Sequence, residues 1–132
     1  MQEVEMARKA LIADDDRDAR FLWQVVAKET GLAVLEASNG REAVDMLSSD
    51  GDIELAILDV IMPLLDGYKV LQQIRTDDRL KELPVIISTA NRTTQTLADF
   101  TADAFTYYVN KASGIENMRK GITRALAGRA EE

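Results

Sequence analysis

Five short apolar runs, separated by segments with helical spacing, limit the folds open to this chain of 132 residues more than any other feature. The runs lie at residues 10–13, 32–37, 54–60, 84–89 and 106–110. Each is apolar almost throughout, which is typical of strands that a parallel sheet buries on both faces. Strands that alternate with helices build such a sheet, and five are too few for an eight-stranded barrel. We therefore predict an α/β fold with an open, doubly wound, five-stranded parallel sheet.

The segments between the runs carry apolar residues three and four positions apart, which is the spacing of one helix face. Gly31 follows the first helix and Asp66-Gly67 opens the third, as helix-end preferences lead one to expect. The predicted apolar faces are Phe21, Leu22, Val25 and Val26 in the first helix; Ala43, Val44 and Leu47 in the second; Val70, Leu71 and Ile74 in the third; and Ile115, Met118, Ile122 and Leu126 in the last.

The segment between the fourth and fifth runs, residues 91–105, gives a weaker signal. It is rich in threonine, a mediocre helix former, so we expect a short or mobile helix there. Residues 1–8 and 128–132 have the look of frayed tails. We therefore expect one domain over residues 1–132, with its core at about 9–128.

The composition excludes several kinds of function. The chain has no cysteine and no histidine, which removes disulfides, thiolate chemistry and histidine general bases. Its formal net charge of −7 argues against a nucleic-acid backbone or an anionic membrane as the main partner. No apolar run approaches the roughly 20 residues of a membrane span, and the N-terminal residues have no apolar signal core. We expect a cytoplasmic protein.

Polar residues follow the apolar runs at one edge of the predicted sheet, where ligands bind in open α/β folds. Asp14 and Asp15 follow the first run, Asp59 stands near the end of the third, Thr89 ends the fourth and Lys111 follows the fifth. Clustered carboxylates suit a hard cation such as Mg²⁺. A carboxylate can also attack phosphorus to give an acyl phosphate, whose other oxygens a hydroxyl and an ammonium would bind.

Taken singly, each of these residues has an ordinary structural explanation. An Asp pair after a strand is often a solvated turn, and Asp16 is expected to cap the first helix. Thr89 belongs naturally in a strand, and a lone lysine such as Lys111 is usually solvated. Their order along one predicted sheet is what favours a metal and phosphoryl site.

With these residues in place, the chain resembles the receiver domain of bacterial two-component response regulators over nearly its whole length. The matching stretches are ALIADDD, ILDVIMPLLDG, IISTAN and YYVNK. The resemblance implies a flavodoxin-like sheet with strand order 2-1-3-4-5 and a phosphoacceptor at Asp59. It also implies Mg²⁺ bound by Asp15, Asp59 and the main-chain carbonyl of Ile61, with Asp14 acting largely through water.

The same resemblance implies how the domain would work. Thr89 would bond the phosphoryl group and Lys111 would pair with it, while Thr89 and Tyr108 would move on activation. The donor would be a sensor histidine kinase or a phosphotransfer protein. The target would be a downstream protein or an effector domain, reached through residues 91–110 and the last helix. The chain would be a monomer or a phosphorylation-dependent dimer without direct nucleic-acid or membrane contact, and would catalyse only its own phosphorylation and dephosphorylation.

The chain departs from the family pattern in four places. Ala112 stands where the family usually has a proline joined by a cis bond, and we expect a trans bond because cis costs about 2.5–4 kcal/mol at a non-proline residue. Asp103-Ala104-Phe105 replaces the usual small-Gly-small stretch. The resemblance implies that Ile61 and Asn91 line the approach to the phosphoryl group, and we expect them to make the phosphorylated state long-lived.

Two other functions remain open from the sequence. One is a receiver-like scaffold that binds its partner without phosphorylation. The other is a phosphatase of the haloacid-dehalogenase type, which also uses Asp, Thr or Ser, and Lys after parallel strands. That class places its nucleophile after the first strand and needs acidic metal ligands after the lysine, whereas beyond Lys111 the acidic residues are only Glu116, Glu131 and Glu132. Whether the chain is a complete regulator or part of a larger one is also open.

Overall fold

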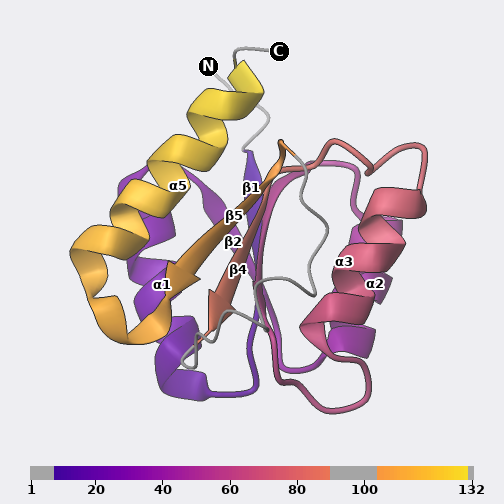
Figure 1. The fold of residues 1–132 in the computed structure, drawn as a ribbon, viewed down its shortest axis with the longest axis horizontal. Coiled ribbons are helices and arrows are strands. Elements are labelled where there is room, and N and C mark those ends of the chain that lie inside the picture. The colour runs from indigo at the N-terminus through magenta and orange to yellow at the C-terminus, as the bar shows by residue number, and fades with distance from the viewer. Residues whose placement is uncertain (1–7, 90–103, 131–132) are drawn as a thin grey trace.

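The computed structural model describes residues 8–89 and 104–130. Figure 1 shows the strands and helices of this part of the chain. The strands are β1 (Lys9–Ala13), β2 (Ala33–Ala37), β3 (Ile53–Asp59), β4 (Val85–Thr89) and β5 (Thr106–Asn110). The helices are α1 (Arg17–Glu29), α2 (Gly40–Ser49), α3 (Gly67–Thr76) and α5 (Ile115–Ala130), with a short 3₁₀ helix, η1 (Lys111–Ser113). The helix expected within residues 91–105 lies almost wholly outside the described residues.

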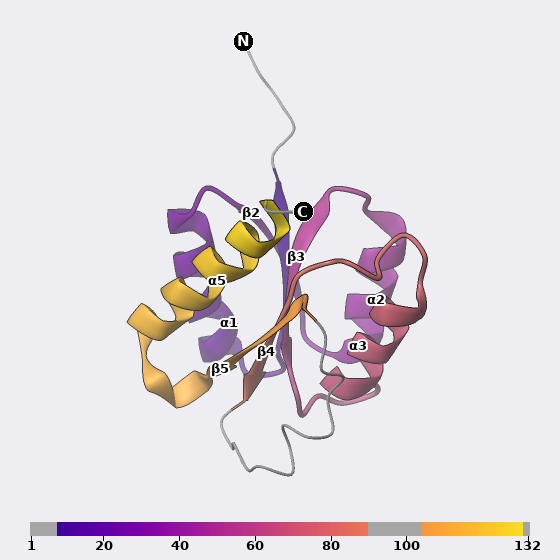
Figure 2. The same cartoon turned by 45° about the horizontal axis from the view of Figure 1, so that its top comes forward.

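The five strands form one parallel sheet in the order β2-β1-β3-β4-β5, which confirms the predicted fold and strand order. Helices α1 and α5 cover one face of the sheet, and α2 and α3 cover the other (Figure 2). All five predicted apolar runs are strands, with ends shifted by no more than one residue. Among the described residues, no helix combines the length and the hydrophobicity of a transmembrane span.

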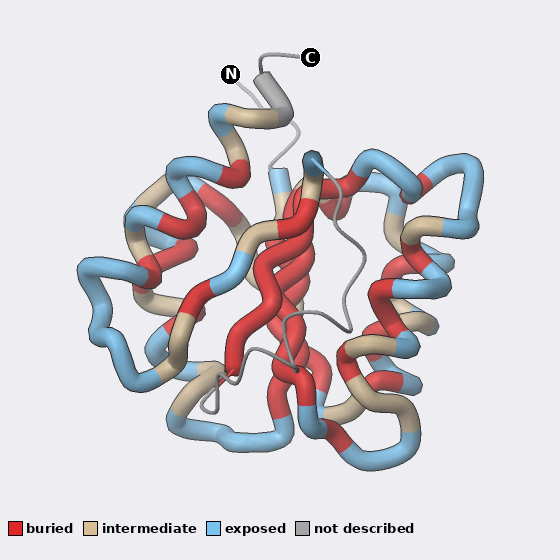
Figure 3. The backbone as a smooth tube through the Cα atoms, in the orientation of Figure 1, coloured by how far each residue is buried: buried red, intermediate tan, exposed pale blue. Residues whose placement is uncertain are grey.

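The sheet divides the apolar core into two layers. Leu11, Leu58 and Ile87 face α2 and α3, whereas Ile12, Ile57 and Ile86 face α1 and α5. This alternation is the period of two that a strand imposes on its side chains. Figure 3 shows the result as a buried central sheet flanked by helices that are buried on one side only.

The apolar face predicted for the first helix is partly wrong. Helix α1 buries Trp23, Val26 and Ala27, whereas Phe21 is 61% exposed and Leu22 is 39% exposed. The buried set has the spacing of a helix face, and the tryptophan is its largest member. The buried indole Nε1 of Trp23 donates a hydrogen bond of 3.2 Å to Ser88 Oγ on β4, which holds this face against the sheet.

The last helix is also longer than expected, because residues 128–130 belong to α5 rather than to a frayed tail. A side chain at Gly128 would overlap with the hydroxyl of Tyr107, so the absence of one lets this turn lie against β5. Met118 and Ile122 lie in the core as predicted, and Leu126 packs against it. Ile115, the first residue of α5, is 39% exposed, so its place in the predicted face is wrong.

The predicted helix ends are confirmed. Asp16 caps α1, with its carboxylate accepting from the Asp18 main-chain N–H at 3.0 Å. Asp66 caps α3 by accepting from the Lys69 N–H at 2.9 Å. Gly31 follows α1 with φ of 87°, a left-handed conformation that glycine adopts without strain.

Candidate functional site

Three carboxylates meet at the carboxyl edge of the sheet. Asp14 follows β1 directly, and Asp59 is the last residue of the neighbouring strand β3. Carboxylate oxygens of Asp14, Asp15 and Asp59 all lie within 4.8 Å of one another. Asp14 and Asp59 are buried, while Asp15 is exposed at the mouth of the cluster. The sequence therefore brings together the three acidic residues that were predicted to converge.

Lys111 extends into this cluster from the end of β5, the edge strand of the sheet. It follows β5, and its Nζ lies 2.9 Å from Asp14 Oδ2 and 3.3 Å from Asp59 Oδ2. The lysine side chain is 20% exposed, so these ion pairs are largely screened from water by protein. One ammonium among three carboxylates leaves the cluster negative.

The pKa values reflect this imbalance. Burial, followed by the charge of Asp14, raises the pKa of Asp59 from 3.8 to about 6, although Lys111 and the Ile61 N–H act to lower it. Burial tends to lower the pKa of Lys111, but the hydrogen bond and charge of Asp14 and those of Asp59 outweigh it and raise that pKa. Asp59 is therefore a carboxylate with an affinity for positive charge that Lys111 satisfies only in part.

The donor set of the cluster fits a hard divalent cation. Its carboxylate oxygens are the ligands that Mg²⁺ prefers, and one of the three residues is open to water molecules that would complete an octahedral shell. Ile61 is close to the site, because its main-chain N–H hydrogen-bonds to the Asp59 carboxylate, and its side chain is 74% exposed. The role of the Ile61 carbonyl as a metal ligand stays a prediction.

Thr89 lies on β4, the strand next to that of Asp59, and Tyr108 lies on β5, one strand further out. Asp59 pairs with Ser88 in the sheet, so Thr89 is one residue beyond it at the end of β4 and is buried. Tyr108, on β5, pairs with Ile87 of β4 and is 37% exposed. It lines a groove of about 460 Å³ with residues of α5, among them Lys120 and Arg124. Thr89 is thus near the acidic cluster, whereas Tyr108 faces the surface.

The turn at Lys111 has Ala112 in place of the proline that is usual in the family. No peptide bond among the described residues is cis, which confirms the trans bond expected before Ala112. The N–H of Ala112, which a proline would lack, donates to Asn110 Oδ1 at 2.9 Å. Ser113 Oγ donates to the Asn110 carbonyl at 2.6 Å. Asn110 therefore closes a 3₁₀ turn that holds the lysine at the edge of the sheet. Asn91 and Asp103 lie outside the described residues.

Glycine at position 67 is needed to bring α3 against the site. A Cβ at Gly67 would overlap with the main-chain carbonyl of Asp59, and the Gly67 N–H donates to the Val60 carbonyl at 2.8 Å. The Asp66-Gly67 pair was predicted only as a helix start. The structure shows that its glycine also lets the backbone of α3 pack directly on the residue that carries the central carboxylate.

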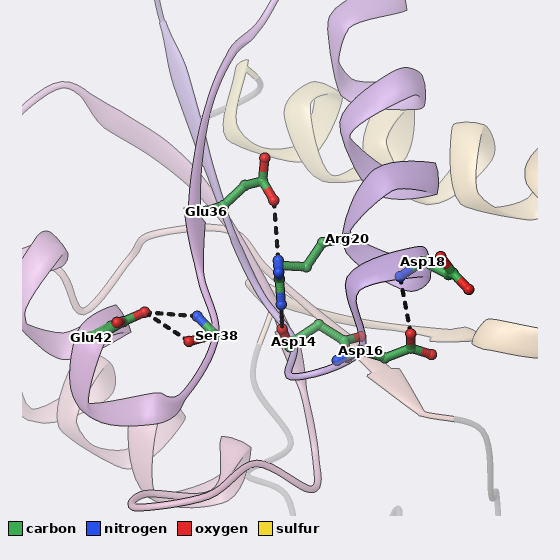
Figure 4. A network of polar contacts seen from close by, with 7 residues as sticks. All are labelled: Asp14, Asp16, Asp18, Arg20, Glu36, Ser38 and Glu42. Carbon is green, nitrogen blue, oxygen red and sulfur yellow. Dashed lines mark hydrogen bonds and ion pairs between the residues drawn. The ribbon is translucent and has the colours of Figure 1, made fainter.

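Two further groups around the site were not predicted. Arg20 on α1 bonds the main-chain carbonyl of Asp14 and the carboxylate of Glu36 on β2, as Figure 4 shows. The indole of Trp23 bonds Ser88, the sheet neighbour of Asp59. An arginine near the start of a helix is too common to attract notice in a sequence. The chain's one tryptophan was a stronger signal, but its spacing alone did not reveal a hydrogen-bond partner.

Comparison with known proteins is consistent with this site. The family model for the response regulator receiver domain matches residues 10–123. The sensor histidine kinase CheAY of Helicobacter pylori is 31% identical over 117 residues, which cover 88% of this chain and 15% of that protein. The probable transcriptional regulator ycf27 of Guillardia theta is 36% identical over 88 residues, which cover 67% of this chain and 33% of that protein. The chain thus spans a third or less of the length of these two relatives.

Solved structures show the same architecture. The receiver domain of a signal transduction histidine kinase from Syntrophus aciditrophicus superposes with a TM-score of 0.81 at 28% identity, covering 92% of each chain. The chemotaxis response regulator CheY4 of Vibrio cholerae superposes with a TM-score of 0.82, covering 91% of this chain and 99% of that one, and at 23% identity it shows the fold alone. The fold, the acidic cluster with its lysine and the family match together show that this chain belongs to the response regulator receiver domain family.

Proposed function

We propose that this domain accepts a phosphoryl group on Asp59 from a phosphohistidine of a partner kinase or phosphotransfer protein. The observation that carries the proposal is the position of Lys111, whose Nζ contacts the carboxylates of both Asp14 and Asp59 where strands β1 and β3 end. Sensor histidine kinases and downstream effectors are the usual partners of receiver domains.

In the proposed reaction a carboxylate oxygen of Asp59 attacks the phosphorus of the phosphohistidine. The phosphorus–nitrogen bond breaks, its electron pair stays on the imidazole, and Asp59 carries an acyl phosphate. The pKa of about 6 keeps most of Asp59 ionised at neutral pH, as a nucleophile must be. Lys111 and Thr89 would bind oxygens of the transferred group, with Lys111 offsetting the charge that builds up there.

Asp14, Asp15, Asp59 and the carbonyl of Ile61 would hold Mg²⁺ beside the acceptor oxygen. The cation would offset the charge of the carboxylates and of the incoming phosphoryl group. Among these ligands Asp15 is the exposed one, so it is the residue that a hydrated cation would meet first. Asp14, which Lys111 already pairs, would act largely through water.

The output would be a change of contacts at the face that contains β5 and α5. The groove beside Tyr108 is lined by Arg119, Lys120 and Arg124. Because Arg119 already pairs with Glu29 and Glu116, a partner with acidic side chains would meet Lys120 and Arg124 there. A phosphoryl group biases this face only if it makes different contacts in two conformations, and Thr89 and Lys111 are the residues placed to make them. The third element of the proposed face, within residues 91–105, lies almost wholly outside the described part of the chain.

The test is incubation with acetyl phosphate and Mg²⁺, followed by intact mass measurement. A single phosphoryl adduct should form on the parent protein and should be absent from Asp59→Asn. An adduct of equal yield on Asp59→Asn would refute the assignment. Absence of an adduct on the parent, with partner binding intact, would favour the phosphorylation-independent scaffold instead. Turnover of p-nitrophenyl phosphate would favour the phosphatase.

A further inference from the structure

Asp14 is held at every polar atom. Its N–H donates to the Ala37 carbonyl at 3.1 Å, and its Oδ1 accepts from the Asp16 N–H at 2.9 Å. Its Oδ2, a buried oxygen without a hydrogen bond of good geometry, has the ion pair with Lys111. Its carbonyl accepts from Arg20 Nη1 at 2.6 Å. Three of these four contacts come from main chain or from the lysine of the site itself, and the fourth comes from the side chain of Arg20 on helix α1.

The bond from Arg20 to the Asp14 carbonyl also affects the position of Asp15. The peptide unit between Asp14 and Asp15 is planar, so a bond to its oxygen sets the direction in which the chain enters Asp15. Asp15 is exposed and has no buried packing of its own to hold it. The orientation of the proposed metal ligand at position 15 therefore depends on how firmly this peptide plane is held.

Arg20 is itself anchored at its other side. Its Nε donates to Glu36 Oε1 on β2 at 3.1 Å, and the arginine side chain is 17% exposed. Figure 4 shows the guanidinium between Glu36 and the Asp14 carbonyl. An arginine that bonds an acceptor on each side has a defined position, because its planar fork is rigid. The Glu36 carboxylate also offsets much of the positive charge of Arg20.

We infer that Arg20 is a positioning residue for cation binding at the acidic cluster. It holds the Asp14–Asp15 peptide in the orientation that points Asp15 at the cation, with Glu36 as its anchor. The inference rests on the proposed function, because it concerns the same metal site. It goes beyond it by assigning a role in that site to a positively charged side chain on α1.

Charge and geometry predict opposite effects for the loss of Arg20. The guanidinium bonds the main-chain carbonyl of Asp14, a member of the acidic cluster, so on charge alone its removal should tighten the binding of a cation. If it positions Asp15, its removal should weaken that binding. Loss of an outer-shell partner commonly costs 10-fold or more in metal affinity, whereas a charge already paired with Glu36 should change it less. We therefore expect geometry to outweigh charge.

The experiment is a titration with Mg²⁺ alone, followed by the NMR shifts of the Asp14, Asp15 and Asp59 backbone amides. Arg20→Gln removes the charge and the bond, and Arg20→Lys keeps the charge without the fork. Arg17→Gln is the matched control, since Arg17 is exposed in the same first turn and makes none of the described contacts to the Asp14–Asp15 peptide. Thermal melting of each variant checks that it folds, and the lysine variant serves if the glutamine variant does not.

Both Arg20 variants should bind Mg²⁺ about tenfold more weakly than the parent. Arg17→Gln should bind it as tightly or slightly more tightly. If a folded Arg20→Gln binds Mg²⁺ as well as the parent or better, Arg20 acts through its charge or not at all, and the inference fails. If the parent protein itself binds no Mg²⁺, the metal site of the proposed function fails first and the inference falls with it.

Discussion

Asp59 is less stable as a carboxylate in the folded protein than it would be in the unfolded chain. Burial and the charge of Asp14 raise its pKa to about 6, so the folded state holds a proton more tightly than the unfolded state between about pH 4 and pH 6. The contribution of this residue to stability is therefore greatest below about pH 4 and falls as the pH rises through 6. The carboxylates of Asp14 and Asp59 repel each other, and a bound cation would offset that repulsion.

Replacing Asp59 by Asn should therefore stabilise the metal-free protein at neutral pH. The expected gain at pH 7 is about 1–2 kcal/mol, less than the full pKa shift implies because solvent reaches the cluster. The gain should shrink toward pH 4, where the parent carboxyl is protonated. Urea unfolding of both proteins with a chelator, at pH 4.5 and pH 7, measures it. A gain that does not depend on pH would show that repulsion at Asp59 is not its cause.

Ile61 should control how long the acyl phosphate survives. Its main-chain N–H bonds the Asp59 carboxylate, and its exposed, branched side chain offers no hydrogen bond to orient an attacking water. Ile61→Asn should speed the loss of the phosphoryl group by about tenfold, which takes only about 1.4 kcal/mol of barrier. Leu64→Asn is the matched control, since Leu64 is a similarly exposed apolar residue of the same loop. The loss of the phosphoryl group is measured by intact mass. Equal rates of loss in the parent and in Ile61→Asn would refute the prediction.

At the scale of helices and strands, a buried hydrogen bond ties α1 to the sheet. Trp23 donates to Ser88, and Ser88 pairs with Asp59 in the sheet, so the bond joins the helix to the strand end beside the acceptor. Buried hydrogen bonds of this kind typically contribute about 0.5–1.5 kcal/mol, and leaving one partner unsatisfied costs more. The stabilities of helix α1 and of the end of β4 should therefore be coupled.

A double-mutant cycle of Trp23→Phe and Ser88→Ala measures that link. Each single change should destabilise the protein, with Trp23→Phe costing more because it also removes buried area. The double variant should be less destabilised than the sum, by about 0.5–1.5 kcal/mol, because the bond is lost only once. Urea unfolding gives the values. Simple additivity would mean that the hydrogen bond contributes nothing measurable.

The elements also show what the sequence could and could not predict. Apolar runs and strand-end residues predicted the sheet and the convergence of Asp14, Asp15, Asp59 and Lys111, because these depend on patterns repeated along the chain. The strand order was predicted only through the resemblance to receiver domains. The prediction of the buried face of α1 was partly wrong, since apolar spacing could not distinguish the exposed Phe21 and Leu22 from the face that contains Trp23. The role of Arg20 depends on a carbonyl and on a strand distant in sequence, and neither leaves a local pattern.

On the scale of the whole molecule, cation binding should raise the stability of the entire domain. A ligand that binds only the folded state adds about 1.4 kcal/mol at ten times its dissociation constant, or a few degrees in Tm for a domain of this size. Mg²⁺ should therefore raise the Tm of the parent, and Asp15→Asn should largely remove the rise. Sodium chloride at matched ionic strength is the control, because a chain of net charge −7 also gains from screening. An equal rise with sodium would contradict a specific site.

The close packing of Gly67 on the Asp59 carbonyl bears on how large-scale mutagenesis of this protein should be read. In a library that scores signalling output, every substitution at Gly67 should score as poorly as a change of the phosphoacceptor, since any side chain there collides with the backbone beside it. Abundance of each variant, scored in parallel, would separate the two positions. Gly67 variants should be depleted from cells, whereas Asp59→Asn should accumulate normally and yet be silent.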